Sequence, residues 1–324
     1  MVKAKDKKNR MLEIFYRAMV GGNINTKALA DEYGVSGKSI SRDIGEIKNF
    51  LSDNRDLVNY KDLRYSASSK TYHLEFDHVL LSKELIAIIK VLIGCRAFSK
   101  EELLTLISKL KAFTSHQDRA LLDQIITKEV YHYNEVGRDC ESVIDNLWKL
   151  TRCIKERQEI SISYYKVDRE PVERRIMPIA ITFSDYYFYL IAYRCDTEDW
   201  TPLYFRVDRI THITEHRTHF TLAPEHDFDV GKLRDKIQFM FPGKLRKIKF
   251  SYTGDSVQAI LDRIPTARVL EQNGKTSILE AETFGTGINM FLLSQGRKIK
   301  ALGPPEFVDE IREEISDMDV QYKE

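Results

Sequence analysis

Residues 186–210 read YYFYLIAYRCDTEDWTPLYFRVDRI and decide the fold of the middle of the chain. Aromatic, β-branched and arginine residues alternate along this stretch, and a period of two is typical of β-strands. A straight strand turns successive side chains to opposite faces, so Arg206 and Arg209 would point to opposite sides of the sheet. Arg209 needs either a local bulge or a structural role, in which it pairs with an acid such as Asp208 or Glu215.

The period of two extends over residues 159–219, in short segments separated by turn-like sequences such as DREP and FSD. The predicted strands are EISISYYKV (159–167), ERRIMPIAIT (173–182), DYYFYLIAYR (185–194), TPLYFRVDR (201–209) and THITEH (211–216). Short, closely spaced strands of this kind predict a compact antiparallel β domain.

The N-terminal residues predict three short helices and a hairpin. The first helix covers residues 7–20, with Met11, Leu12, Phe15 and Met19 at helical spacing, and either Asn25 or Thr26 caps the second. Ser36 caps a third helix, on which an apolar face is formed by Ile40, Ile44, Ile47 and Leu51. Residues 55–76 look extended, with Lys70 at the tip of the turn. This order is that of a winged helix-turn-helix, which lays its third helix in the major groove and rests its hairpin on the DNA backbone.

The segment GVSGKSISRDIGEIKNFL (34–51) resembles the recognition region of the DeoR-type regulators, whose signature is V-S-x-x-[ST]-I-x-R-D-I. The resemblance implies that Lys38, Ser39 and Arg42 read base edges. The full set of predicted DNA contacts is Thr26, Ser36, Lys38, Ser39, Ser41, Arg42 and Lys70. Residues 1–52 hold 10 Lys and Arg against 6 acids, although the whole chain has a net charge of only +1. The alternative is an ordinary three-helix bundle with solvated charges.

The β region resembles the WYL domain of bacterial regulators. The matching residues are Arg175-Ile176-Met177-Pro178, Phe188-Tyr189-Leu190 and Phe205-Arg206-Val207-Asp208-Arg209-Ile210. Phe188 stands where the family has the tryptophan that gives the domain its name. FSYTG and LLSQGRKIKALGPPEFVDEI, after residue 240, resemble the C-terminal extension that accompanies this domain.

This resemblance implies a domain that senses a negatively charged ligand, with nucleic acid or nucleotide species as candidates. Guanidinium groups stay charged and offer a planar fork of donors to phosphate, and tyrosines supply hydroxyl donors and stacking faces. The predicted ligand-binding residues are Tyr164, Lys166, Tyr189, Arg206 and Arg209.

The sequence thus predicts an α+β, multidomain chain. We expect a winged helix-turn-helix DNA-binding domain over residues 1–77 and a helical linker over 78–157. A small antiparallel, Sm-like WYL domain follows over 158–222. The last domain, 223–324, has the order β-α-β-β-α-β, which predicts a ferredoxin-like domain that matches the C-terminal extension called WCX.

Known catalytic motifs do not occur in the sequence: it has no G-x-x-x-x-G-K-[ST], no G-x-S-x-G and no H-E-x-x-H. We therefore expect no enzyme activity, no metal and no cofactor. Two alternatives stay open. A nucleic-acid-processing or nucleotide-hydrolysing enzyme would need a carboxylate cluster that holds Mg²⁺, and an interaction adaptor would not bind DNA.

The four cysteines form no C-x-x-C motif, which indicates a reducing cytoplasm. The most apolar run, residues 79–95, is interrupted by Lys83, Glu84 and Lys90, which favours a buried helix over a membrane span. We expect a cytoplasmic, homodimeric bacterial transcription factor, in preference a repressor, that binds an inverted-repeat operator in double-stranded DNA.

Overall fold

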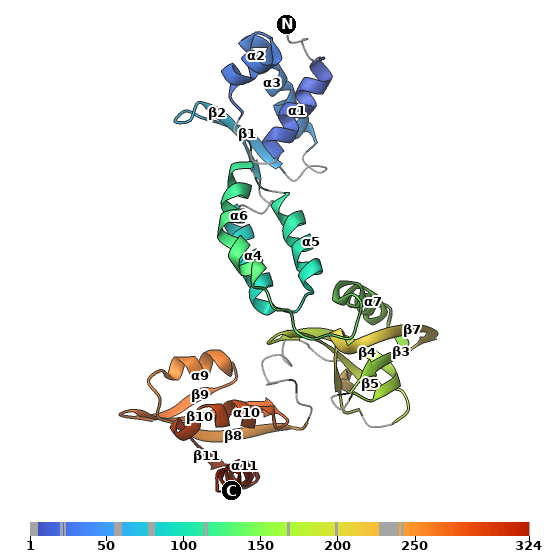
Figure 1. The fold of residues 1–324 in the computed structure, drawn as a ribbon, viewed down its shortest axis with the longest axis vertical. Helices are drawn as coiled ribbons and strands as arrows, with labels where there is room; N and C mark the ends of the chain where they lie inside the picture. Colours follow the sequence, from blue (N-terminus) through green and yellow to red (C-terminus); the bar gives the residue numbers. More distant parts are fainter. Residues whose placement is uncertain are drawn as a thin grey trace. The chain divides into compact units, whose positions relative to one another are not determined.

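The computed structural model describes residues 6–19, 22, 24–54, 60–76, 82–112, 114, 116–166, 169–197, 200–226, 240 and 243–323. The chain divides into two compact units, residues 1–135 and 136–324, and Figure 1 shows the helices and strands of each. The described residues form three antiparallel sheets, of two, five and four strands. The chain is therefore a multidomain α+β protein, as the sequence predicts.

The first unit begins with the predicted three helices and hairpin. The elements are α1 (Lys7–Met19), α2 (Thr26–Tyr33), α3 (Gly37–Asp53), β1 (Tyr60–Ser66) and β2 (Thr71–Phe76). Asn25, not Thr26, caps α2, because its side chain accepts a hydrogen bond from the backbone N–H of Ala28 at 2.9 Å. Lys70 lies at the end of the hairpin turn with a φ of 55°, and Asn25 Nδ2 donates to the Lys70 carbonyl at 3.2 Å.

The buried face of α3 is the predicted one. Ile40, Ile44, Ile47 and Leu51 are each at most 4% exposed and belong to one core cluster with residues of the other helices and the hairpin. The buried face of α1, in contrast, centres on Ile14 and Ala18, and the prediction is wrong for Leu12, which is 66% exposed. Local spacing allowed either of two adjacent faces, and packing against α3 selected the one that contains Ile14.

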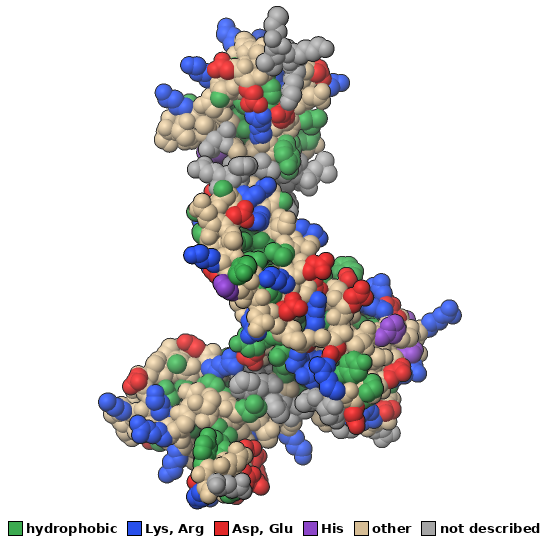
Figure 2. Space-filling model, in the orientation of Figure 1, with side chains coloured by type: hydrophobic (Ala, Val, Ile, Leu, Met, Phe, Trp, Pro, Cys, Tyr) green, Lys and Arg blue, Asp and Glu red, His purple; other side chains and the backbone are tan. Residues whose placement is uncertain are grey.

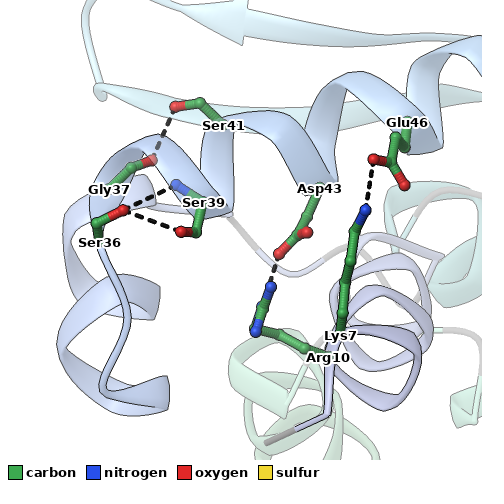
Figure 3. Close-up of polar contacts among 8 residues, drawn as sticks. All are labelled: Lys7, Arg10, Ser36, Gly37, Ser39, Ser41, Asp43 and Glu46. Atoms are coloured by element: carbon green, nitrogen blue, oxygen red, sulfur yellow. Dashed lines mark hydrogen bonds and ion pairs between the residues drawn. The ribbon is translucent and has the colours of Figure 1, made fainter. Parts of the chain in front are cut away.

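Two ion pairs join α1 to α3. Arg10 Nε donates to Asp43 Oδ2 at 2.6 Å, and both residues are buried. Lys7 Nζ donates to Glu46 Oε1 at 2.7 Å on the surface (Figure 3). Because a buried charge is costly unless it is paired, the Arg10–Asp43 contact fixes the rotation of α3 on α1.

The predicted helical stretch continues the first unit with α4 (Ser82–Cys95), α5 (Lys100–Lys111) and α6 (His116–Tyr131). Ser99 and Glu102 form a capping box at the start of α5. The predicted boundary between residues 77 and 78 lies outside the described residues, and the division into four domains stays a prediction. In the described part of the chain, no helix is long and apolar enough to cross a membrane.

The second unit begins with α7 (Val143–Glu156), which packs on a five-stranded antiparallel sheet. The strands are β3 (Gln158–Tyr165), β4 (Pro171–Ser184), β5 (Tyr187–Arg194), β6 (Leu203–Arg206) and β7 (Ile210–His219). Their order in the sheet, β6-β5-β4-β3-β7, places the last strand beside the first. This is the small antiparallel domain that the alternating pattern predicts.

The predicted strand over residues 201–209 is too long. β6 ends at Arg206, and a single turn of 3₁₀ helix, η1 (Val207–Arg209), follows it before β7 begins. Asn146 on α7 stabilises this turn, because its side-chain amide donates to the carbonyl oxygen of Ile210 at 2.8 Å. The period of two therefore stops in the middle of the FRVDRI motif.

The last part of the unit has the predicted order β-α-β-β-α-β and a final helix. Its elements are β8 (Leu245–Tyr252), α9 (Val257–Arg263), β9 (Arg268–Asn273), β10 (Thr276–Phe284), α10 (Gly287–Ser294), β11 (Ile299–Gly303) and α11 (Pro305–Gln321). The sheet order β11-β8-β10-β9, with every pair antiparallel, is that of a ferredoxin-like domain. Gly274, with a φ of 60°, allows the tight turn between β9 and β10.

Candidate functional site

The first candidate site is the start of α3, drawn in Figure 3. Ser36 caps the helix, because its side chain accepts from the backbone N–H of Ser39 at 3.2 Å, and the two hydroxyls lie 2.9 Å apart. The Ser41 hydroxyl donates back to the Gly37 carbonyl at 3.0 Å. The three predicted serines thus use their hydroxyls to stabilise the start of the helix.

Unlike the serines, the predicted DNA-contacting cations do not bind the helix. Lys38 and Arg42 lie one turn apart on α3, and Lys70 lies at the tip of the hairpin. All three side chains are exposed, and within the described residues none of them makes a hydrogen bond or an ion pair. Thr26 is the first residue of α2. Figure 2 shows Lys and Arg side chains on the part of this unit where α2 and the hairpin lie.

The second candidate site is a pocket of about 860 Å³ in the β domain, at the upper end of the range usual for small-molecule sites. Residues of β3, β4, β5, β6 and η1 line it, and all five residues that the sequence predicts for ligand binding are among its lining residues. The described lining includes five cations and no acid. These cations are Lys166, Arg174, Arg194, Arg206 and Arg209.

Arg206 is held rigidly within the pocket. Its Nη2 and Nε donate to the two carboxylate oxygens of Asp208, at 2.5 and 3.1 Å, and its guanidinium carbon lies 3.4 Å from the centre of the Tyr187 ring. Burial opposes the charge of Arg206, but the hydrogen bond and charge of Asp208 outweigh it and raise the pKa of Arg206. Arg206 therefore presents a fixed, fully charged guanidinium to the pocket.

Arg209 lines the same pocket as Arg206, although a straight strand would turn the two apart. The 3₁₀ turn, rather than a bulge, brings Arg209 round to the side of Arg206. Neither of the two acids considered from the sequence pairs with it, because Asp208 binds Arg206 and Glu215 binds Arg152 at 2.5 Å. Half-buried Arg209 makes no hydrogen bond or ion pair to any described residue.

The other three cations of the lining come from neighbouring strands: Arg174 lies on β4, Arg194 lies on β5 and Lys166 follows β3. Lys166 Nζ lies 3.2 Å from a carboxylate oxygen of Glu170, and Arg194 binds Asp196 through two hydrogen bonds of 2.7 and 2.6 Å. Arg174, on β4, makes no hydrogen bond or ion pair in the described part of the chain. The pocket thus joins three cations that form ion pairs with acids to two, Arg174 and Arg209, that form none with described residues; Arg174 acts on Asp196 only through its charge.

Four tyrosines also line the pocket: Tyr164, Tyr165, Tyr189 and Tyr204. Tyr164 packs edge-on against Phe205, with 5.2 Å between ring centres. Burial raises the pKa of Tyr204, and burial also raises the pKa of Tyr189 although Arg206 opposes the shift. Both phenols therefore stay neutral at physiological pH. Phenols in this state donate hydrogen bonds and offer stacking faces.

Sequence reasoning did not select Arg174 and Tyr204, which line the pocket, or Tyr187, which stacks on Arg206. Arg174 has the same parity along β4 as buried Ile176 and Pro178, and that signal marks it as an inward-facing charge. Tyr204 has the parity of Arg206 on β6, which gives the same kind of signal. Tyr187, which stacks on Arg206, had no such signal, because the contact depends on how β5 and β6 pair.

The described residues contain no group of three or more His, Cys, Asp or Glu side chains that could hold a metal ion. No disulfide joins any of the four described cysteines, and burial raises the pKa of Cys195 to about 11. His216, one of the strand histidines, shares a hydrogen bond of 2.8 Å with the Ser161 hydroxyl.

Residues 145–215 match the family model for the WYL domain. The matched segment begins within α7 and includes the sheet as far as β7, together with most of the pocket. The chain therefore contains a WYL domain over these residues, as the resemblance of its β motifs predicts.

Two solved structures are similar to the whole chain. Proteasome accessory factor B/C (PafBC) of Arthrobacter aurescens is 16% identical with a TM-score of 0.28, over 99% of this chain and 50% of that one. A CRISPR Cas-related protein is 14% identical with a TM-score of 0.40, over 89% of this chain and 87% of that one. This chain spans half the length of the PafBC chain.

Proposed function

We propose that this WYL-domain protein is a sequence-specific, DNA-binding transcriptional regulator, and that its WYL domain senses a negatively charged, nucleic-acid or nucleotide-like ligand. The observation that carries the ligand proposal is the described lining of the 860 Å³ pocket, with five cations and no acid. Arg209 supplies positive charge that pairs with no described acid, and Arg174 makes no ion pair within the described residues, although its charge also acts on Asp196. An anion is the ligand that compensates such charges.

The aromatic part of the lining supports a nucleotide rather than a simple anion. Four tyrosines lie among the cations, and unpaired bases stack on aromatic side chains while their phosphates bind basic groups. Tyr189 lies directly opposite Arg206 in the pairing of β5 and β6, so that a stacking face and a phosphate donor are adjacent.

The DNA-binding proposal rests on the first unit. Its three helices and hairpin have the winged helix-turn-helix order, and exposed Lys38 and Arg42 lie on the first two turns of α3, the third helix. The Arg10–Asp43 pair holds that helix on α1. We propose that Lys38 and Arg42 contact base edges, with Ser39 beside them, and that Lys70 contacts the backbone.

We further propose a homodimeric repressor in a bacterial cytoplasm. A two-fold dimer fits an inverted-repeat operator, because each copy reads one half-site. Separate roles for residues 1–77, 78–157, 158–222 and 223–324 are part of this proposal. For the ligand to regulate DNA binding, its affinity must differ between the DNA-competent and DNA-incompetent states.

The ligand proposal is tested by fluorescence anisotropy with a short labelled single-stranded oligonucleotide. The chain carries Lys38→Ala and Arg42→Ala in every sample, so that α3 does not contribute to binding. We expect saturable binding that Arg209→Ala weakens roughly tenfold or more, because a charge-assisted hydrogen bond is lost. Arg217→Ala, an exposed arginine on β7 of the same domain, is the matched control and should leave the affinity unchanged. Equal affinities for the Arg209 and Arg217 variants would overturn the pocket assignment.

A further inference from the structure

A second, smaller cavity of about 160 Å³ adjoins the ligand pocket. The two cavities share Lys166, Arg206 and Arg209, so the same side chains face both. The smaller cavity is completed by Gly137, Asp139, Arg169 and Tyr187.

The charges around the small cavity leave a positive excess. Four cations line it, and Asp139 is the one acid of its described lining. That carboxylate is bound to the guanidinium of Arg169. Lys166 and Arg206 have the partners already described, whereas Arg209 has none among the described residues. One cation of the cluster thus lacks a counter-charge in the part of the chain that the structure describes.

The walls of the small cavity are fixed by backbone hydrogen bonds. The N–H groups of Asp139 and Cys140 both donate to the Asp208 carbonyl, at 2.8 and 3.0 Å. Arg206 Nη2 donates to the Gly137 carbonyl at 3.4 Å, and the Tyr187 ring stacks on the same guanidinium. The segment from Gly137 to Cys140 is therefore attached directly to the 3₁₀ turn that carries Arg209. A preformed cluster of donors of this kind binds an anion without having to be ordered first.

The size of the cavity limits the group that it holds. Its volume of about 160 Å³ is less than a fifth of the 860 Å³ of the larger pocket. The small cavity therefore suits a compact group such as one phosphoryl group. The base and sugar belong in the larger, tyrosine-lined pocket.

We propose that the small cavity is a second anion subsite, which binds a terminal phosphate of the ligand in the larger pocket. Arg209 and Arg206 contact the ligand from between the two cavities, and Arg169 and Lys166 complete the subsite for the terminal phosphate. This inference rests on the proposed ligand-sensing function and makes it more specific, because it selects ligands with a free terminal phosphate over those that have only internal phosphodiesters.

The test is isothermal titration calorimetry with two dinucleotides that differ only in the 5′-phosphate, pdTdT and dTdT, in the Lys38→Ala, Arg42→Ala background. We expect the wild-type pocket to bind pdTdT about tenfold more tightly than dTdT, as a charge-assisted phosphate contact requires. Arg169→Gln should reduce this difference to within about twofold while dTdT binds as before. Asp139→Asn removes the one acid and should enlarge the difference. Arg217→Gln is the control and should change neither affinity.

Hydrogen exchange gives a second, local measurement. We expect pdTdT, but not dTdT, to slow exchange of the Asp139 and Cys140 amides, which lie at the subsite wall. If both dinucleotides bind equally, or if Arg169→Gln weakens both to the same extent, the subsite is wrong while the ligand pocket stands. If neither dinucleotide binds, the proposed pocket function fails and the subsite fails with it.

Discussion

The guanidinium of Arg206 donates two hydrogen bonds to the carboxylate of Asp208, from Nη2 at 2.5 Å and from Nε at 3.1 Å, although only Val207 separates the two residues in the chain. Their side chains are 5% and 17% exposed, so this is a largely buried ion pair. It forms because β6 ends at Arg206 and the 3₁₀ turn folds Asp208 back beneath it. The pair links the conformation of the turn to the position of the cation that faces the ligand.

Breaking this pair from either side should destabilise the WYL domain by about 3 kcal/mol, because one buried charge is left without its partner. We predict that Arg206→Ala and Asp208→Ala each show this loss. The double variant should lose less unfolding free energy than the sum of the two single losses, because it leaves no unpaired buried charge. Urea unfolding followed by tryptophan fluorescence measures it, because Trp148 and Trp200, the two tryptophans of the chain, both lie within residues 145–215, which match the WYL domain. Strictly additive losses would contradict the coupling.

Arg209→Ala should behave differently from Arg206→Ala. Arg209 has no ionic partner among the described residues, so we predict a change of at most about 0.5 kcal/mol in the unfolding free energy, as for an ordinary surface substitution. The same urea titration measures it. A loss as large as that of Arg206→Ala would show that Arg209 is a structural residue.

Alkaline pH should destabilise the WYL domain through Tyr204. Burial raises the pKa of this phenol in the folded chain, whereas an unfolded chain releases the proton near pH 10. The contribution to stability is therefore complete below about pH 10 and is lost as the pH rises toward the folded pKa.

We predict that Tyr204→Phe reduces the fall of the urea midpoint between about pH 9.5 and pH 11.5, again followed by tryptophan fluorescence. Tyr186→Phe is the matched control, because Tyr186 is 44% exposed and does not line the pocket. Identical pH profiles for the Tyr204 variant and the wild type would exclude this origin.

The predicted DNA contacts on α3 form two groups: residues whose side chains already make hydrogen bonds within the helix, such as Ser41, and residues whose side chains make none to described residues, such as Arg42. We predict that Arg42→Ala weakens operator binding by about 1–3 kcal/mol, because a contact to a base edge is lost. Ser41→Ala should change it little, since the Ser41 hydroxyl already donates to the Gly37 carbonyl at 3.0 Å. Gel-shift titrations at one fixed salt concentration measure both variants. A larger loss for Ser41→Ala than for Arg42→Ala would reverse the assignment.

The sequence predicts most elements of this fold because their signals are local. Ile40 and Ile44 repeat at helical spacing, and the turn at Gly274 follows directly from the Asn-Gly pair. The order of strands in the two larger sheets needed the family resemblance or the β-α-β-β-α-β order, because strand adjacency is not a local property.

The parts that sequence reasoning missed depend on contacts between distant residues. Arg10 lies on the buried face of α1 because Asp43, on another helix, neutralises it. The reorientation of Arg209 depends on a 3₁₀ turn that Asn146 of α7 stabilises through its side-chain amide. No periodicity in FRVDRI reveals such a turn, so the sequence left open whether Arg209 lies on the side of Arg206.

We propose that one chain binds DNA through α3 and a nucleotide-like ligand through its WYL pocket, and that the two binding events are coupled. Footprinting of the DNA upstream of the protein's own gene, with and without a short single-stranded oligonucleotide, tests it most directly. We predict a protected inverted repeat whose occupancy changes severalfold with the oligonucleotide in the wild type, and that Arg209→Ala keeps the footprint but loses the response. Protection that is absent, or that responds to the oligonucleotide equally in both proteins, would contradict the account.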